Sequence, residues 1–433
     1  MKLVIVGTGY VGLVSGACFA EFGYQTICVD KDKNRLQILE DGKCPFFEPG
    51  MDELLTKHIK KTKLLSFSDS LNQSMKKADV ILITVGTPTK RLEGDADLSS
   101  IWDVAKDISM NIEDYCIVAT KSTVPVGTTQ EIKKIISLNV DNKKFDVVSN
   151  PEFLREGSAI NDFLRPDRIV IGADSDKSKT IMKDLYRPLN LIETPMVCTS
   201  IETAEIIKYA SNSFLATKIS FINEVADLCE AVGANVQDVA KGMGIDKRIG
   251  SKFLHAGPGF GGSCFPKDVK AFVATAKKNN IHFSILEAVN ASNEKRVNKI
   301  VERILNKVKF DSNSSIGFLG LSFKPNTDDI RDSTSMKIAT LLQEKNIQIK
   351  CYDPSAMDNA KLKNNKLLFF KSAYEACEGV NAIIIGTEWN EFRALDFNKI
   401  FNNIKEPIMF DLRNIYNTDE MIKKGFTYYG IGK

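Results

Sequence analysis

The sequence predicts an α/β protein in which two doubly wound parallel sheets are joined by a long central helix and a helical region suited to pairing subunits. Three observations predict this fold class. Short apolar strands alternate with helical segments over residues 1–198, a stretch with helical period fills residues 199–308, and residues 309–433 repeat the opening strand–helix–strand plan. Because 433 residues are too many for one core, we expect these three segments to be separate domains.

Composition excludes several classes of protein. The hydrophobic fraction of 43% and the charged fraction of 26% are typical of soluble globular proteins. A net charge of +3, with no stretch that concentrates arginine and aromatic residues, argues against a nucleic-acid partner. No apolar run approaches the roughly 20 residues that span a bilayer, and a strand begins at Leu3, which leaves no room for a signal peptide. We expect no membrane association.

Cysteine and histidine usage indicates the compartment and excludes a metal site. The nine cysteines are scattered and odd in number, which is typical of a reduced, cytoplasmic protein. His58, His255 and His282 are the whole histidine complement. Neither a histidine-rich metal site nor a Ser-His-Asp triad is therefore expected.

The first element is a strand–turn–helix unit. Lys2–Val6 is an apolar strand, Gly7-Thr8-Gly9-Tyr10-Val11-Gly12 is a glycine turn, and a helical pattern then runs to Gly23. Three glycines between a strand and a helix are typical of a Rossmann-like dinucleotide-binding domain. The glycines allow a tight turn and let a pyrophosphate approach the helix N-terminus, whose amides favour anions.

The second strand, Gln25–Val29, ends in Asp30. An acid at this distance from the glycine turn accepts hydrogen bonds from the adenosine ribose and repels a 2′-phosphate, which favours NAD over NADP. Two alternatives stay open. Asp30 can instead close a surface turn, and the nearby Lys31 and Arg35 can tolerate a phosphate.

Polar loops follow the next strands of the N-terminal domain. The predicted strands are Val80–Val85, Cys116–Lys121, Asp146–Ser149 and Arg168–Ile171. Ligands of open α/β sheets bind at the carboxyl ends of strands. Thr123, Glu152 and Glu156 follow such ends and are placed to meet a cofactor or substrate. Each of them can instead be a helix cap or an acid in a first helical turn.

The middle of the chain is helical. Residues 201–232 and 284–308 have apolar positions at helical spacing. Lys208 and Asn212 are four residues apart and therefore share one face of the first helix. The ordinary alternative is a lysine that faces solvent. A lysine and an asparagine on one face of an otherwise apolar helix favour a functional pair over that alternative.

The last third repeats the nucleotide-binding plan without its glycines. The predicted elements are a strand at Ser315–Ser322, a helix at 333–345, a strand at Gln348–Tyr352 that ends in Asp353, and a strand at Ala382–Gly386. The turn after the first strand carries Lys324 and Arg331 instead of a glycine trio. These cations either hold a substrate's phosphates or neutralise the neighbouring Asp328, Asp329 and Asp332.

Cys264 is the strongest candidate for a nucleophile. It stands in Gly261-Gly262-Ser263-Cys264-Phe265-Pro266-Lys267-Asp268. The glycines remove side chains that would shield the sulfur, and Lys267 favours the thiolate, which attacks carbonyl carbon. The alternative is a cysteine that fills a core as a small hydrophobe. In a chain with a dinucleotide turn, a nucleophilic cysteine indicates oxidation through a covalent thioester.

Together these blocks resemble the UDP-glucose/GDP-mannose dehydrogenase family over almost the whole chain, from Gly7 to Arg413. The motifs are Gly-x-Gly-x-x-Gly at 7–12, Val-Gly-Thr-Pro at 85–88, Ser-Thr-Val-Pro-Val-Gly-Thr at 122–128, Asn-Pro-Glu-Phe-Leu-Arg-Glu-Gly at 150–157, Glu-Ile-Ile-Lys-Tyr-Ala-Ser-Asn at 205–212, the Cys264 block, Phe323-Lys324 and Asp329-Ile330-Arg331-Asp332. Ser333-Thr334 departs from the usual Ser-Pro, and residues 90–95 read as a variable surface loop.

The resemblance implies a reaction and a set of catalytic roles. The C6 alcohol of UDP-glucose is oxidised to a carboxylate while two NAD+ are reduced, through a thiohemiacetal and a thioester on Cys264. Lys208 and Asn212 stabilise the oxyanion, and Asp268 works with Lys208 in proton transfer. Thr123 orients the water, and Glu152 is the general base for hydrolysis.

The resemblance also implies the binding residues. The NAD site is formed by Gly7, Gly9, Val11, Gly12, Asp30, Arg35, Thr87, Thr123, Glu156, Lys267 and Arg331. The UDP-sugar site is formed by Glu152, Phe153, Leu154, Lys208, Asn212, Arg248, Lys252, Phe253, Gly261, Lys324 and Arg413. In the family the residue matching Arg248 reaches the partner subunit's sugar site, which implies a homodimer.

Three other functions compete with this one. A sibling enzyme of the family acts on GDP-mannose or a UDP-N-acetylhexosamine, but residues 248–254 and 259–268 look most like the UDP-glucose branch. A two-electron β-hydroxyacid dehydrogenase shares the N-terminal fold and has no use for Cys264. A non-catalytic NAD-sensing scaffold has no use for Cys264, Lys208 or Asp268.

Overall fold

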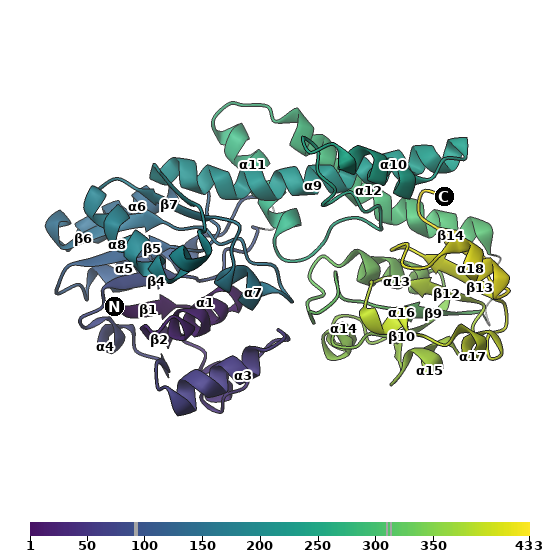
Figure 1. Cartoon of the computed structure of the whole chain (residues 1–433), viewed down its shortest axis with the longest axis horizontal. Coiled ribbons are helices and arrows are strands. Elements are labelled where there is room, and N and C mark those ends of the chain that lie inside the picture. Colours follow the sequence, from purple (N-terminus) through teal and green to yellow (C-terminus); the bar gives the residue numbers. More distant parts are fainter. Residues whose placement is uncertain (91–93, 309–310, 312–313) are drawn as a thin grey trace. The chain divides into compact units, whose positions relative to one another are not determined.

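The computed structural model describes residues 1–90, 94–308, 311 and 314–433, so part of the expected surface loop at 90–95 lies outside the described residues. The chain forms two compact units (Figure 1). Unit 1 comprises Met1–Ser211 and Lys270–Ile281, and unit 2 comprises Asn212–Val269 and His282–Lys433.

Unit 1 is built on one eight-stranded sheet with the strand order β3-β2-β1-β4-β5-β6-β7-β8. The strands are β1 (Lys2–Val6), β2 (Gln25–Val29), β3 (Leu65–Ser68), β4 (Val80–Ile83), β5 (Cys116–Thr120), β6 (Phe145–Ser149), β7 (Ile169–Ala173) and β8 (Met196–Thr199). The first six strands are parallel in the order of a Rossmann sheet, which confirms the predicted fold class. β7 runs antiparallel to β6 and parallel to β8.

Helices cover both faces of this sheet, which explains why its central strands are apolar throughout. Leu3 and Ile5 pack with one layer of helices, while Val4 packs with the other. The first layer contains α1 (Tyr10–Glu21), α3 (Met51–Thr56), α7 (Ala159–Leu164) and α8 (Asp176–Leu185), and the second contains α4 (Leu71–Met75), α5 (Ser99–Ser109) and α6 (Thr128–Ser137). The short helix α2 (Lys33–Glu40) follows β2.

The central helices agree closely with the sequence pattern. α9 is one uninterrupted helix over Ile201–Val232, as predicted, and α12 spans Ser284–Lys307 (Figure 1). Within residues 199–308, two helices were not predicted: α10 (Val236–Ile245) and α11 (Phe265–Lys278). α11 begins directly after Cys264. Its start could not be predicted because glycines precede it and Pro266 lies in its first turn, although proline is tolerated at that position.

Unit 2 contains a second doubly wound sheet, which is parallel throughout with the order β11-β10-β9-β12-β13-β14. The strands are β9 (Ser315–Leu319), β10 (Gln348–Tyr352), β11 (Leu368–Phe369), β12 (Ala382–Ile385), β13 (Ile408–Asp411) and β14 (Thr427–Gly430). The helices are α13 (Thr334–Glu344), α14 (Met357–Lys363), α15 (Ala373–Cys377), α16 (Asn390–Arg393), α17 (Phe397–Phe401) and α18 (Thr418–Lys423). Phe318 and Leu319 bury opposite faces of this sheet in two separate cores.

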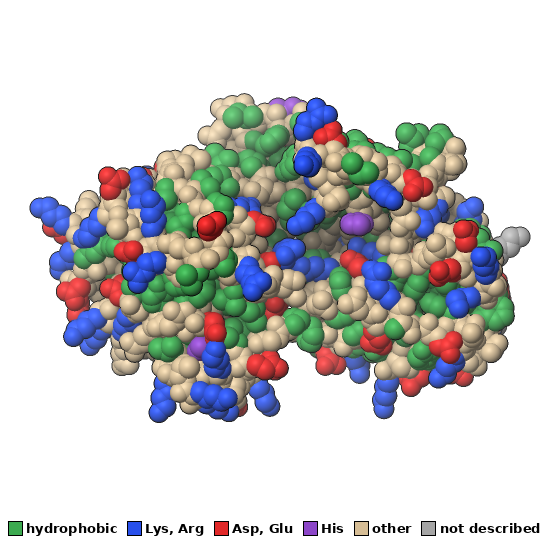
Figure 2. Space-filling view, viewed as in Figure 1, with side chains coloured by type: hydrophobic (Ala, Val, Ile, Leu, Met, Phe, Trp, Pro, Cys, Tyr) green, Lys and Arg blue, Asp and Glu red, His purple; other side chains and the backbone are tan. Residues whose placement is uncertain are grey.

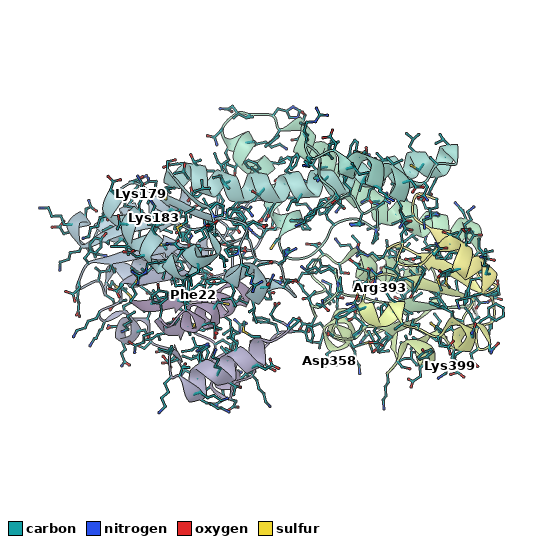
Figure 3. The ribbon with its side chains drawn as sticks, in the orientation of Figure 1. Phe22, Lys179, Lys183, Asp358, Arg393 and Lys399 are labelled. Atoms are coloured by element: carbon teal, nitrogen blue, oxygen red, sulfur yellow. The ribbon has the colours of Figure 1, made fainter. Side chains whose placement is uncertain are left out.

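Many charged side chains lie on the surface of both units. Lys and Arg alternate with Asp and Glu over much of the face shown in Figure 2. Figure 3 labels exposed cations of this kind, Lys183 on α8 and Arg393 and Lys399 at α16 and α17. Among the described residues, none of the helices combines the length and apolar character that crossing a bilayer requires.

Candidate functional site

The glycine turn of unit 1 has the geometry of a dinucleotide cradle. Gly7 has a φ of 104°, in the left-handed region that favours glycine. A Cβ on Gly12 would lie 1.9 Å from the carbonyl oxygen of Gly7, so the close turn requires glycine at that position. Gly9 is the N-cap of α1 and makes no side-chain hydrogen bond to it. The first backbone N–H groups of the helix are therefore available to bind an anion. The turn therefore fits the pyrophosphate of NAD.

Asp30 is held as an ionised acceptor at the end of β2. One carboxylate oxygen accepts hydrogen bonds from the backbone N–H and hydroxyl of Thr8 at 2.7 and 2.6 Å, and the other accepts from Asp32 at 3.0 Å. Arg35 approaches it to 3.6 Å. Burial acts to raise the pKa of Asp30, but these hydrogen bonds and the Arg35 charge outweigh it and lower the pKa. A fixed carboxylate beside the glycine turn suits the ribose contact predicted for NAD.

The loops that follow β4 and β5 are joined. The Thr87 hydroxyl donates to the backbone carbonyl of Thr123 at 2.9 Å, and the Ser122 hydroxyl donates to that of Val85 at 2.7 Å. The structure thus brings together Thr87 and Thr123, two residues predicted to line the NAD site.

Glu205 was not singled out from the sequence, yet it supports the Thr123 loop. Its buried carboxylate accepts from the backbone N–H of Gly127 at 2.7 Å and of Thr129 at 2.9 Å. Burial raises the pKa of Glu205, against these hydrogen bonds. Glu205 precedes Lys208 by three residues on α9, so one turn of this helix carries both an anchor for the loop and the predicted oxyanion cation. An acid on a largely apolar helix was the signal available in the sequence.

Glu152 and Lys208 form a buried ion pair. Their side chains are only 6% and 4% exposed, and Oε1 of Glu152 lies 3.2 Å from Nζ of Lys208. The other oxygen of Glu152 accepts from the backbone N–H of Leu154 at 2.5 Å. The structure therefore joins the predicted general base and the predicted oxyanion donor, which come from distant parts of the sequence.

Phe153, in the same loop as Glu152, lies close to two cations. The Arg168 guanidinium is 3.5 Å from the centre of the Phe153 ring, and Nζ of Lys208 is 5.2 Å from it. Such cation–π contacts orient an aromatic ring. The sequence predicts Arg168 only as the start of a strand, because a residue's place in the strand pattern does not reveal which groups its side chain contacts.

Cys264 lies in unit 2 at the start of α11. Its backbone carbonyl accepts from the N–H of Asp268 at 2.8 Å, which closes the first helical turn. The approach to Cys264 requires glycine, because a Cβ on Gly261 would meet the carbonyl oxygen of Asp332 at 2.4 Å and one on Gly262 would meet the Phe323 ring at 2.7 Å. The glycines thus seat the cysteine loop against the turn that carries Phe323 and Asp332.

The exposure of Cys264 separates it from most of the other cysteines. All nine cysteines are free thiols; six of them are buried, Cys44 and Cys264 are half-buried, and Cys198 is exposed. Desolvation raises the pKa of Cys28 and of Cys377 to about 12, which keeps those thiols protonated and inert. The Cys264 thiol is therefore more accessible to a substrate than the six buried thiols are.

Asp268 is fully buried and doubly held. It accepts from the Asn212 amide at 2.6 Å and from the Lys267 ammonium at 2.7 Å. The structure brings these three predicted residues together one helical turn after Cys264 and directs Lys267 towards Asp268.

The cations of the second nucleotide-like turn have partners within unit 2. Arg331 forms a forked pair with Asp329, at 2.9 and 2.7 Å from Nε and Nη2, while its side chain stays 64% exposed. Nζ of Lys324 lies 5.4 Å from the Phe323 ring centre. Arg413 is mostly buried and donates to the backbone carbonyls of Gly386 and Phe323 at 2.8 and 3.2 Å. Arg413 thus connects the segments that follow β9 and β12, in addition to the substrate contact predicted for it.

Arg248, Lys252 and Phe253 lie on the loop after α10. The Arg248 side chain is 89% exposed and pairs with Asp246 at 2.6 Å. Lys252 is exposed, and Phe253 has a φ of 67°, in the left-handed region. The predicted site residues thus fall into two groups: Thr123, Glu152 and Lys208 belong to unit 1, and Asn212, Cys264 and Asp268 belong to unit 2.

Comparison with known proteins identifies a family for most of the chain. Models of the UDP-glucose/GDP-mannose dehydrogenase family match as an NAD binding domain over residues 1–190, a central domain over 202–295 and a UDP binding domain over 317–418. A UDP-glucose 6-dehydrogenase of Rhizobium meliloti is 49% identical, with both chains covered in full.

Solved structures show the same likeness. A UDP-glucose dehydrogenase from the hyperthermophilic archaeon Pyrobaculum islandicum is 34% identical with a TM-score of 0.92, covering 100% of this chain and 97% of the other. A GDP-mannose dehydrogenase from Pseudomonas aeruginosa is 28% identical with a TM-score of 0.56, covering 99% of both chains. The chain therefore belongs to the UDP-glucose/GDP-mannose dehydrogenase family and is an NAD-dependent dehydrogenase.

Proposed function

We propose that this enzyme oxidises UDP-glucose at C6 to UDP-glucuronate, in two successive oxidations at a single carbon. The observation that carries the proposal is the half-buried Cys264, seated on glycines against the Phe323–Asp332 turn and followed by the buried Asp268. A two-electron dehydrogenase needs no such thiol. The UDP-glucose substrate is favoured over GDP-mannose by the 49% identity to the Rhizobium meliloti enzyme, against 28% to the GDP-mannose dehydrogenase.

NAD+, held at the glycine turn, would supply the oxidising power for both oxidations, in which C6 loses two hydrides and thus four electrons in all. In the first oxidation the C6 hydroxyl loses its proton while Lys208 and Asn212 stabilise the developing oxyanion. Preorganised donors of this kind act mainly on the charge that appears in the transition state. The product of this step is an aldehyde.

Cys264 then forms a covalent bond to the aldehyde carbon. Its thiol proton is lost, the sulfur–carbon bond forms, and the thiohemiacetal oxygen is again stabilised by Lys208 and Asn212. Asp268 works with Lys208 in these proton transfers. Loss of the second hydride leaves a thioester on Cys264.

Water finally hydrolyses the thioester. Thr123 orients the water and Glu152 removes its proton, so the acyl carbon leaves as a carboxylate and the Cys264 thiol is regenerated. The ion pair of Glu152 with Lys208 supports this role, because it places the proposed general base beside the proposed oxyanion donor.

The remaining residues bind and orient the two ligands. NAD is held by Gly7, Gly9, Val11, Gly12, Asp30, Arg35, Thr87, Thr123, Glu156, Lys267 and Arg331. The UDP-sugar is held by Phe153, Leu154, Arg248, Lys252, Phe253, Gly261, Lys324 and Arg413, together with Glu152, Lys208 and Asn212.

The ratio of NADH formed to sugar consumed tests the proposed reaction. With NAD+ and UDP-glucose, we expect two NADH for each sugar, measured by absorbance against chromatographic quantification of UDP-glucuronate. One NADH per sugar would contradict the thioester route. Turnover with GDP-mannose or a UDP-N-acetylhexosamine in place of UDP-glucose would assign a sibling activity, and no turnover with any of them would contradict the proposed substrate class.

We also propose that the enzyme is a cytoplasmic homodimer. The nine free thiols support the reducing compartment. The dimer is supported by Phe214, Phe221 and Leu228, which recur every seven residues along α9 and are 65%, 52% and 61% exposed. A second copy of the same helix would bury this stripe. The implied role of Arg248 in a partner's site also requires a dimer.

The Phe221→Glu variant is expected to separate the subunits, because the substitution places a charge in a desolvated seam. Light scattering should show the mass of one chain, and turnover should fall at least about tenfold through loss of the partner's contribution. Ile281→Glu, at an exposed apolar position outside the stripe, should remain dimeric and active. A fully active Phe221→Glu dimer would contradict the assignment.

A further inference from the structure

A buried carboxylate without a part in the chemistry joins two functional segments of unit 1. Glu48, in the stretch between α2 and α3, is 7% exposed. It accepts hydrogen bonds from the backbone N–H of Gly157 at 2.6 Å and of Ala159 at 2.8 Å, and from the hydroxyl of Tyr10. One side chain therefore connects the glycine turn with the end of the 150–157 segment.

Tyr10 stands between Gly9 and Val11 in the glycine turn and begins α1. Its hydroxyl also accepts from the backbone N–H of Gly157 at 3.0 Å, and its ring packs on Phe46 with the ring centres 4.9 Å apart. Burial raises the pKa of Tyr10 far above its usual range, and the hydrogen bond to Glu48 raises it further. The hydroxyl thus remains a donor to Glu48 at neutral pH.

The segment that Glu48 holds is the one that carries the proposed general base. At its first end, Glu152 pairs with Lys208. In its middle, the backbone N–H and the guanidinium of Arg155 both donate to Asp162, at 2.8 and 2.5 Å. At its last end it is fixed to the glycine turn through Glu48 and Tyr10. The glycine turn and this segment are therefore connected through hydrogen-bonded side chains.

We propose that Tyr10 and Glu48 are positioning residues that transmit NAD+ binding at the glycine turn to the segment carrying Glu152 and Glu156. Binding of the cofactor orders the turn, and the Tyr10–Glu48 link then orders residues 150–159. The expected effect on catalysis rests on the proposed function of Glu152. The ordering of residues 150–159 by NAD+ does not rest on that function. Such coupling is reciprocal, so ordering of the segment also strengthens cofactor binding.

Hydrogen exchange of peptides covering residues 150–164 tests the link without any sugar. In the full-length protein, saturating NAD+ is expected to slow exchange in these peptides about tenfold, within the range of coupling between sites in proteins. In Tyr10→Phe and Glu48→Gln, NAD+ should still bind but slow exchange less than about twofold. Tyr115→Phe is the matched control, because it removes a tyrosine hydroxyl that donates to a different carboxylate, Asp146, at 2.6 Å.

Three results would overturn the link: no slowing by NAD+ in the unaltered protein, equal slowing in all variants, or equal loss of slowing in Tyr115→Phe and Tyr10→Phe. Steady-state kinetics supply the second readout. With UDP-glucose, Tyr10→Phe should lower kcat about tenfold while Tyr115→Phe leaves kcat and both KM values unchanged. If UDP-glucose is not oxidised but the exchange results hold, the proposed function fails while the link stands.

Discussion

The Cys264→Ala variant is expected to lose at least about 10⁴-fold in kcat, because removal of a covalent nucleophile leaves only binding and orientation to accelerate the reaction. The thiol is half-buried and its removal leaves a small space, so the free energy of unfolding should fall by less than about 1 kcal/mol. NAD+ affinity, measured by calorimetry, should be unchanged.

The exposed Cys198 offers a matched control for Cys264. Cys198→Ala removes a thiol from the edge strand β8, and its kcat should equal that of the unaltered enzyme. Turnover by Cys264→Ala within a few fold of this control would refute the nucleophile. A Cys264→Ala protein that melts far below the control would point to a structural thiol instead.

The Lys208→Met variant is expected to have the second large effect. Loss of the ammonium removes an oxyanion donor, which should lower kcat at least about 10²-fold. It also leaves the carboxylate of Glu152 buried and unpaired, which should reduce the free energy of unfolding by about 3 kcal/mol. Thermal or urea denaturation and steady-state kinetics measure the two losses separately.

The double variant Lys208→Met with Glu152→Gln distinguishes the two roles of the ion pair. A neutral amide in place of the unpaired carboxylate should restore at least about 1 kcal/mol of the lost stability, since contacting residues couple strongly. Activity should not return, because both the oxyanion donor and the general base are then absent. Recovery of turnover along with stability would show that Lys208 only holds the loop in place.

The sequence predicted the elements whose pattern is local. β1, β2, β10 and α9 have the predicted bounds, because period-two and period-3.6 patterns are read from a few neighbouring residues. α11 was missed because its first turn contains Pro266 and follows a run of glycines, both of which usually mark a loop.

The partners of the site residues were harder to predict than the residues themselves. Motifs identified Glu152 and Lys208 separately, but their contact depends on how α9 packs against the sheet of unit 1. Glu48 lies 109 residues from Gly157, and Glu205 lies 78 from Gly127. Pairings over such distances are set by strand order, which no local pattern encodes.

The structure describes the contacts of Asp30 and Arg331, two residues for which the sequence allowed alternative roles. The Asp30 carboxylate is fixed by Thr8 beside the glycine turn, so it does more than close a surface turn. Arg331 forms a forked pair with Asp329, which is the neutralising arrangement, while its exposed side chain remains accessible to a ligand.

The most direct measurement of the central chemistry is the mass of the enzyme during turnover. Glu152→Gln enzyme, in which hydrolysis should be slow, is mixed with NAD+ and UDP-glucose and quenched in acid. We predict an adduct with the mass of the UDP-glucuronyl group, located on the peptide that contains Cys264 and absent when that cysteine is alanine. Two NADH formed per sugar with no adduct on Cys264, or with an adduct on another residue, would contradict the thioester mechanism.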